Sequence, residues 1–168
     1  MRRLVALLVL AGCSSPADPA PAPPAVRDPF IAFADDFAPY ASWEKFFIPG
    51  AELDDPIHGG NRTIYVNKRP PRGSKQFPVG TIIVKQMAFP DGQTFAMVKR
   101  GGGYNPEGAV GWEWFRLDIS PASGTSIAWR GMGPPAGEKY GGDAGGVCNG
   151  CHFAGKDNDW VQYPALKL

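Results

Sequence analysis

Cysteine and histidine are scarce in this chain of 168 residues, which has three cysteines and two histidines. Cys148 and Cys151 lie close together near the C-terminus, and Cys13 lies at the end of a short apolar leader. No cysteine pair is therefore left for a disulfide across the body of the chain, although small exported domains often depend on one. This absence indicates that Cys148 and Cys151 serve another purpose.

Near its start, the chain also lacks an apolar run long enough to span a membrane. After a basic head, residues 4–12 form an apolar run of nine residues, which is too short to cross a bilayer as a helix. This combination predicts a secretory signal peptide over residues 1–12. The run ends in LAGC, which is similar to the lipobox of bacterial lipoproteins and predicts lipidation of Cys13. The alternative is a plain signal peptide followed by an incidental cysteine.

The chain has no excess of charge of either sign. Its 17 Lys and Arg residues are scattered and stand against 16 Asp and Glu, for a net charge of +1, so nucleic-acid binding has no support. Residues 13–29 are rich in Pro and Ala, which predicts an extended tether. We therefore predict one domain over residues 30–168, exported as a periplasm-facing lipoprotein that Cys13 anchors to a bacterial membrane.

Sustained helical periodicity is missing from the middle of the chain. Apolar spacing predicts one helix over residues 39–47, which ends before Pro49 and Gly50. Beyond it, short runs rich in β-branched and aromatic residues alternate with turn-forming clusters, such as PDG at 90–92. Five runs predict strands: 62–67, 80–89, 93–100, 111–119 and 125–131. We expect an α+β fold, a predominantly antiparallel β-sheet with a few helices packed on it, and an irregular glycine-rich segment before Cys148.

Cys148, Cys151 and His152 form the pattern C-x-x-C-H near the end of the chain. Two thiols at this spacing can add to the two vinyl groups of haem, and the adjacent histidine can ligate the iron. A structural zinc site needs four ligands, and only His58 remains outside the motif to contribute. A thioredoxin-like redox motif needs a βαβ context that the sequence lacks. We therefore predict one covalently attached haem c, with its iron, per chain.

The position of this motif excludes the two commonest haem c folds. A four-helix-bundle cytochrome needs helical periodicity throughout, and a class-I cytochrome needs an axial methionine after the motif, whereas none follows His152. Besides the lysines, the candidates for a sixth iron ligand are His58, Met87, Met97 and Met132. None has a distinguishing context, so we expect a vacant or water-filled distal position, which allows small-molecule chemistry.

Lys85 lies inside the predicted strand 80–89, where alternation places it on one face with Ile83 and Met87. If that face points inward, the amine is buried and needs a partner or a function. If the face is exposed, Lys85 is an ordinary surface residue. Periodicity leaves both interpretations open.

Six blocks of the chain, taken in order, resemble the cytochrome P-460 family, which includes cytochrome c′-beta. They are HGGNRTIYVN, FPVGTIIVKQ, MVKRGGGYNPEG, GWEWFRLD, CNGCH and DNDWV. The resemblance runs from about Trp43 to Trp160, and the order and spacing of the blocks are more specific than any one of them. It implies an exported, predominantly β-sheet protein, often a homodimer, with a five-coordinate haem that a histidine ligates.

The resemblance also implies roles for two further residues. In the hydroxylamine-oxidising members a lysine is cross-linked to the haem edge and corresponds to Lys85, while Arg62 matches an arginine near the distal pocket. The chain departs from the family at a distal glutamate, because the matching place falls near Gly103. Proton removal from hydroxylamine needs a positioned base. Nothing in the sequence assigns Glu107 or Glu113 to that role, so the departure puts hydroxylamine oxidation in doubt.

Three functions agree with these residues. The first is an oxidoreductase that acts on hydroxylamine or nitric oxide and exchanges electrons with a redox partner, with Lys85 and Arg62 as catalytic residues. The second is a non-catalytic gas-binding protein similar to cytochrome c′-beta, which the missing acid favours. The third is a simple electron-transfer cytochrome, in which His58 or a methionine supplies a sixth ligand opposite His152.

Overall fold

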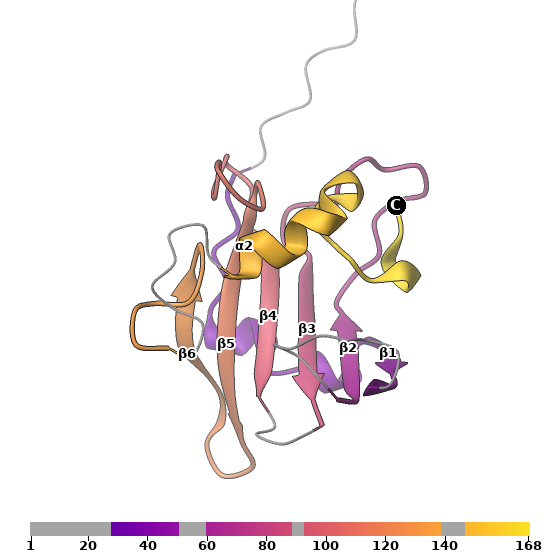
Figure 1. Cartoon of the computed structure of the whole chain (residues 1–168). Coiled ribbons are helices and arrows are strands. Elements are labelled where there is room, and N and C mark those ends of the chain that lie inside the picture. The colour runs from indigo at the N-terminus through magenta and orange to yellow at the C-terminus, as the bar shows by residue number, and fades with distance from the viewer. Residues whose placement is uncertain (1–27, 51–59, 89–92, 139–146) are drawn as a thin grey trace, which may run out of the picture.

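The computed structural model describes residues 28–50, 60–88, 93–138 and 147–168. Within these ranges the chain forms a six-stranded antiparallel sheet whose strands follow one another in sequence order (Figure 1). The strands are β1 (Glu44–Ile48), β2 (Arg62–Val66), β3 (Ile82–Met87), β4 (Thr94–Lys99), β5 (Trp112–Ser120) and β6 (Gly124–Gly131). The helical elements are α1 (Ala34–Phe37), η1 (Tyr40–Ser42), α2 (Val147–His152), η3 (Phe153–Asn158) and η4 (Pro164–Leu166), of which the η elements are 3₁₀ turns. The predicted α+β class with a predominantly antiparallel sheet is confirmed.

The five predicted strands are present as β2 to β6, with ends that lie within two residues of the predicted ones. Each strand pairs with the next along the chain, as short connections between antiparallel strands favour. The turn predicted at 90–92 lies outside the described residues. So do residues 139–146 of the glycine-rich segment before α2.

The helix predicted over residues 39–47 is wrong, because only η1 (Tyr40–Ser42) is helical there, as a single 3₁₀ turn, and residues 44–47 belong to the edge strand β1. Pairing with β2, in which Phe46 lies opposite Ile64, gives the backbone hydrogen bonds that a helix would have made internally. Phe46 also packs against Tyr163 from the C-terminal segment, here residues 147–168. Phe47 points the other way and is 63 % exposed. Aromatic residues are common in strands. Pairing with β2 therefore stabilises the strand conformation of this stretch over the helical one.

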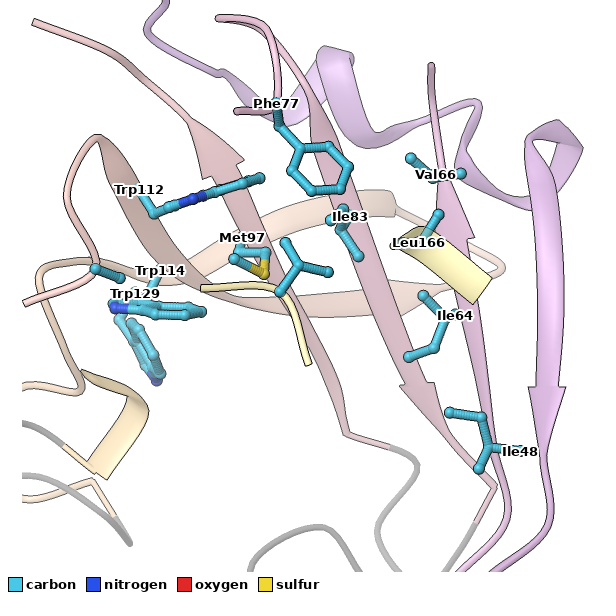
Figure 2. Close-up of a cluster of buried hydrophobic side chains, with 12 residues drawn as sticks. Ile48, Ile64, Val66, Phe77, Ile83, Met97, Trp112, Trp114, Trp129 and Leu166 are labelled. Atoms are coloured by element: carbon cyan, nitrogen blue, oxygen red, sulfur yellow. The ribbon is translucent and has the colours of Figure 1, made fainter. Parts of the chain in front are cut away.

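The sheet has two buried faces, and each is covered by one end of the described chain. Main members of the C-terminal face, so named here for the segment that covers it, are Ile64, Val66, Ile83, Met97, Trp112, Trp114 and Trp129 (Figure 2). Val161 and Leu166 from the C-terminal segment pack on this face. Sheet residues of the opposite, N-terminal face are Tyr65, Ile82, Val84, Ala96, Val98, Phe115 and Leu117. Ala32, Phe37 and Tyr40 cover that second face.

A buried ion pair attaches the C-terminal segment to the sheet. Lys99 at the end of β4 donates from Nζ to Asp159 Oδ1 at 2.6 Å, and both side chains are less than a tenth exposed. The other carboxylate oxygen of Asp159 accepts from the Phe77 backbone N–H, and its backbone carbonyl accepts from Trp112 Nε1. Burial lowers the pKa of Lys99, while its bond to Asp159 opposes that change. The pair therefore lies at the centre of a satisfied polar network, as a buried charge requires.

A second charge cluster lies on the N-terminal face. Glu113 of β5 is 1 % exposed. Arg130 of β6 donates to both of its oxygens, at 2.7 and 2.8 Å, and Arg100 donates to one at 3.1 Å. Arg130 also donates to the backbone carbonyl of Ala32, which ties the N-terminal segment to the sheet. The role of Glu113 is therefore structural, on the face away from α2.

None of the helices in the described ranges is both long and apolar enough to cross a membrane. The signal peptide over residues 1–12, Cys13 and nearly all of the tether over residues 13–29 lie outside the described residues. These assignments stay predictions.

Replacing Lys99 by methionine leaves the Asp159 carboxylate buried without its cation, so we expect a loss of about 3–5 kcal/mol in the free energy of unfolding. The matched control is Lys156→Met, which removes an ion pair of nearly equal length, 2.7 Å to Asp157, whose partners are 47 % and 90 % exposed. That change costs about 0–1 kcal/mol. Urea unfolding followed by far-UV circular dichroism measures both. Equal losses in the two variants would contradict the anchoring role of the buried pair.

Candidate functional site

The short helix α2 presents all three residues of the C-x-x-C-H motif. Cys148 and His152 are four residues apart and Cys151 is three from Cys148, so the three side chains share one side of the helix. Cys148 is half-buried and packs against the C-terminal face of the sheet, whereas Cys151 is exposed. Neither forms a disulfide within the described residues. Figure 1 shows α2 crossing the sheet in front of β4 and β5.

The His152 ring is oriented by the chain that follows it. Its Nδ1 lies 2.7 Å from the backbone carbonyl of Trp160, and since a carbonyl only accepts, Nδ1 carries the proton. This fixes the tautomer in which Nε2 is the nitrogen with a lone pair, as second-sphere bonds to ligating histidines commonly do. The ring also packs on Trp114 of β5, with 4.6 Å between centroids. The imidazole is therefore positioned and set up to ligate a metal through Nε2.

The turn that carries the Trp160 carbonyl has an unusual backbone. Asp159 and Trp160 both have positive φ angles, 52° and 67°, a conformation that is uncommon for residues other than glycine. The Lys99–Asp159 pair and the Trp112 bond to the Asp159 carbonyl fix this turn on the sheet. The orientation of His152 thus depends on contacts with β4 and β5.

Asn149, inside the motif, joins α2 to the sheet through a buried amide that makes five hydrogen bonds. Its Oδ1 accepts from Trp114 Nε1 at 2.9 Å, from Asn105 Nδ2 at 2.8 Å and from the Ala109 backbone N–H at 3.1 Å. Its Nδ2 donates to Asn105 Oδ1 and to the backbone carbonyl of Met132. Asn149 is 8 % exposed, so these bonds form away from water, where they fix geometry most strongly.

Lys85 lies on the C-terminal face and next to the motif. In the sheet register it is opposite Ile64 and Phe95 and shares a face with Ile83, which resolves the alternation toward the covered face. The Lys85 side chain is half-buried, and Nζ lies 6.0 Å from the centre of the Phe95 ring. Burial raises the pKa of the Cys148 thiol to about 11, and the positive charge of Lys85 opposes that rise. Lys85 and Cys148 are therefore close enough to interact electrostatically.

Arg62 is on the same face as Lys85, further along the sheet. It begins β2, lies opposite Ile48 and Met87, and is 8 % exposed. It is thus a buried residue of the C-terminal face, which differs from the surface arginine that a strand edge would otherwise present.

The acids near the predicted distal position do not gather on the C-terminal face. Glu113 lies on the opposite face and is bound by two arginines, and Glu107 is exposed. Gly103 is also exposed, at a positive φ of 71°, and an added Cβ there would meet no atom within 4 Å. Neither Glu107 nor Glu113 is placed to take a proton at this site.

The methionines proposed as sixth ligands differ in position. Met87 and Met97 are buried on the C-terminal face, at 7 % and 5 % exposure, and Met97 is opposite Trp114 in the register. Met132 is 54 % exposed, and its carbonyl bonds to Asn149. His58 lies outside the described residues. In the described part of the chain, no three His, Cys, Asp or Glu side chains converge as metal ligands would.

Sequence reasoning missed most of the residues that position the motif. Asn149 occupies a variable place within C-x-x-C-H, so the pattern gives it no signal. Trp114 and Asp159 lie in two of the blocks quoted above, but nothing local distinguishes their roles. Only the spatial contacts with His152 and Lys99 reveal them.

Comparison of the chain with protein-family models, with curated proteins and with solved structures finds no match. The cytochrome P-460 resemblance therefore remains an interpretation of those six blocks of residues.

Replacing Gly108 by alanine tests the Asn149 network. The new Cβ would lie 2.4 Å from the side-chain amide of Asn149 and 2.6 Å from Asn105 Oδ1, so the two amides must separate. We expect a loss of about 1–3 kcal/mol in the free energy of unfolding. The control, Gly150→Ala on α2, meets no atom within 4 Å and should be neutral or stabilise by up to about 1 kcal/mol. Urea unfolding of both variants checks the pair; an unchanged Gly108→Ala would refute the tight packing.

The two thiols of the haem-free protein should differ in reactivity. Because Cys148 is half-buried with its pKa raised to about 11, iodoacetamide at pH 8 should modify exposed Cys151 more than about tenfold faster. Removing the Lys85 charge with Lys85→Met raises the Cys148 pKa further, so its alkylation slows by about threefold. Lys45→Met, an exposed lysine of β1 opposite Tyr65 of the N-terminal face, is the control. Peptide mass spectrometry over time measures both sites, and equal rates for the two thiols would contradict the assignment.

Proposed function

We propose that this protein is an exported mono-haem c-type cytochrome that binds small nitrogen compounds such as nitric oxide or hydroxylamine. Cys148 and Cys151 would hold the haem covalently, and His152 Nε2 would ligate its iron. The observation that carries the proposal is the hydrogen bond from His152 Nδ1 to the Trp160 carbonyl at 2.7 Å, on a helix that also presents both thiols. It gives this histidine the tautomer and orientation typical of an iron ligand.

The arrangement of the thiols supports haem over zinc. The side chains of Cys148, Cys151 and His152 lie along one side of α2, and among the described residues they do not join a group that could surround a metal ion. Haem attachment needs this arrangement, because each thiol bonds to a different vinyl group and only the histidine reaches the iron.

The face of the sheet beneath α2 also fits haem. It is apolar around Trp114, Met97 and Ile83, as a porphyrin requires. Two of its buried donors, Trp129 Nε1 and Arg116 Nε, have no partner among the described residues, and a haem carries carboxylates that can accept from them. Lys85 lies on the same face, and its positive charge would favour those carboxylates.

When bound, haem supplies an iron centre for ligand binding and one-electron transfer. The chain's own residues determine which of these follows. His152 would ligate the iron, and the Trp114 ring, which packs on the imidazole, restricts how it turns. Lys85 is near enough to Cys148 for its charge to oppose the rise in that thiol's pKa, and it is the amine that would tune, or cross-link to, the edge of the macrocycle.

Gas binding without turnover is the second candidate, and the position of Glu113 favours it. Hydroxylamine oxidation removes protons and needs a base near the ligand. The buried Glu113 is on the other face and neutralised by Arg100 and Arg130. This supports a protein that binds nitric oxide, with oxidation of hydroxylamine weak or absent.

The decisive experiment is mass spectrometry and absorption spectroscopy of the protein produced with a haem c attachment system. We expect the mass of one haem per chain, borne by the peptide with Cys148 and Cys151, and a ferrous spectrum that changes on adding carbon monoxide or nitric oxide. A double variant with both cysteines changed to alanine should carry no covalent haem. Absence of haem from the unmodified chain, or a ferrous form that binds neither gas, would overturn the proposal.

The same sample separates the two candidate reactions. A peptide in which Lys85 is joined to haem, together with hydroxylamine turnover that Lys85→Met abolishes and Lys45→Met does not, identifies the oxidoreductase. Release of an unmodified Lys85 peptide, with tight nitric oxide binding and no turnover, identifies the gas-binding protein. Low-spin iron in both oxidation states would instead indicate a sixth protein ligand, for which Met87 and Met97 are the buried candidates on this face.

A further inference from the structure

Three tryptophans lie beside one another on the C-terminal face, and they use their indole N–H groups differently (Figure 2). Trp112 Nε1 donates to the Asp159 carbonyl and Trp114 Nε1 to Asn149 Oδ1, so both bind the C-terminal segment. Trp129 of β6 belongs to the same cluster and is 8 % exposed, but its Nε1 is buried and meets no acceptor in the described part of the chain.

The neighbour of Trp129 on β5 carries the second atom of this kind. Arg116 is opposite Trp129 in the register, so both side chains leave the sheet on the same face. Its outer nitrogens pair with Glu138 at 2.8 Å and with Asp118 at 3.7 Å, whereas Nε is buried and has no partner among the described residues. Trp129 Nε1 and Arg116 Nε, two donors at paired positions of adjacent strands, therefore lack hydrogen-bond acceptors among the described residues.

The chemistry of these donors identifies what they bind. Buried polar groups are nearly always hydrogen-bonded, and an unsatisfied donor is costly. An indole N–H and an arginine Nε–H only donate, so the missing partner is an acceptor. A guanidinium favours an oxyanion, and a carboxylate has two oxygens that two donors can share.

The location of the pair connects it with the motif. Lys85, Phe95, Arg116 and Trp129 form one row of cross-strand neighbours on the C-terminal face. At one end, Lys85 interacts with Cys148; at the other, Trp129 is two residues from Gly131, the partner of Trp114 on which His152 packs. A planar group attached at α2 would lie against this row.

We propose that Trp129 Nε1 and Arg116 Nε together bind one propionate carboxylate of the haem that Cys148 and Cys151 attach. This rests on the proposed function. It adds a carboxylate-binding site, which fixes the orientation of the macrocycle on the sheet and raises the tendency of the iron to be reduced, since neutralising a nearby anion disfavours the more positive ferric state.

The test compares haem-loaded Trp129→Phe with the unmodified haem protein. Phenylalanine keeps an aromatic ring against Phe95, at 6.5 Å in the unmodified chain, and removes the donor together with one ring of the indole, a loss of volume that the Trp43→Phe control shares. We expect the carboxylate bands in infrared and resonance Raman spectra to shift. At a fixed potential, the ferrous-to-ferric ratio should fall by about threefold to tenfold, the size of effect that one ordinary hydrogen bond gives. Trp43→Phe, a half-buried tryptophan on the N-terminal face, is the matched control and should change neither.

Arg116→Gln provides an independent arm, which decides the matter should Trp129→Phe fold poorly by far-UV circular dichroism. It should shift the same bands and the ratio in the same direction. Its control, Arg69→Gln, removes the same charge at the opposite edge of the sheet, where Arg69 pairs with exposed Glu44 of β1. A similar shift in both arginine variants would mean a long-range charge effect and would overturn the site.

The outcomes also separate this inference from the proposed function. A chain without covalent haem refutes both. A haem protein whose carboxylate bands and ferrous-to-ferric ratio are unchanged in Trp129→Phe and Arg116→Gln refutes only the propionate site. If those variants instead lose affinity for added nitrite while the bands stay constant, the donors serve a free oxyanion, and the propionate assignment is overturned.

Discussion

The buried ion pair between Lys99 and Asp159 determines how the end of this chain lies on the sheet. The last 22 described residues contain one α-helix of six residues, which is too short to be stable by itself. Asp159 binds Lys99, the Phe77 backbone and Trp112, and so it fixes the turn whose next carbonyl, that of Trp160, orients His152. Without this pair, the imidazole would lose its acceptor and the motif its position.

Polar anchors within the apolar C-terminal face explain why the orientation of the His152 ring is specific. Hydrophobic contacts of Val161 and Leu166 hold the C-terminal segment down, but such contacts are non-directional. Asn149 and Asp159 supply direction, because each has several fully buried hydrogen bonds whose loss is costly. The two anchors lie before and after His152, so the ring is fixed from both sides.

The two faces of the sheet carry different charged groups, and this difference bears on which kind of group the protein binds. On the N-terminal face, Glu113 is matched by two arginines and ties down the N-terminal segment through Arg130. On the C-terminal face, Arg116 pairs with Glu138 and Asp118, Asp159 is bound to Lys99, and the positive charge of Lys85 opposes the rise in the pKa of Cys148. Trp129 Nε1 and Arg116 Nε lack acceptors among the described residues, which favours an anionic bound group on that face. Of the two acids near the predicted distal position, Glu107 is exposed and Glu113 lies on the other face, so neither supplies the base that oxidation needs.

Part of this fold could be read from local pattern. Runs of β-branched and aromatic residues that alternate with turn residues predict strands β2 to β6, because this pattern is a local property. The helix predicted over residues 39–47 is wrong because its aromatic spacing suits either a helix or a strand. Pairing with β2 stabilises the strand at residues 44–47. The orientation of Lys85 was left open by alternation alone, since period two does not say which face is covered; the packing of Ile83 and Cys148 settles it.

The sequence alone determined the C-x-x-C-H motif, the antiparallel strands and the residue types available for chemistry, because spacing and alternation are written along the chain. The tertiary structure decided which face α2 covers, that Glu113 is turned away from it, and that Trp129 and Arg116 meet. Those facts depend on residues far apart in sequence: Asn149 contacts Trp114 across 35 positions, and Asp159 contacts Lys99 across 60. Contacts of that range arise only when strands and loops pack together, so no local pattern contains them.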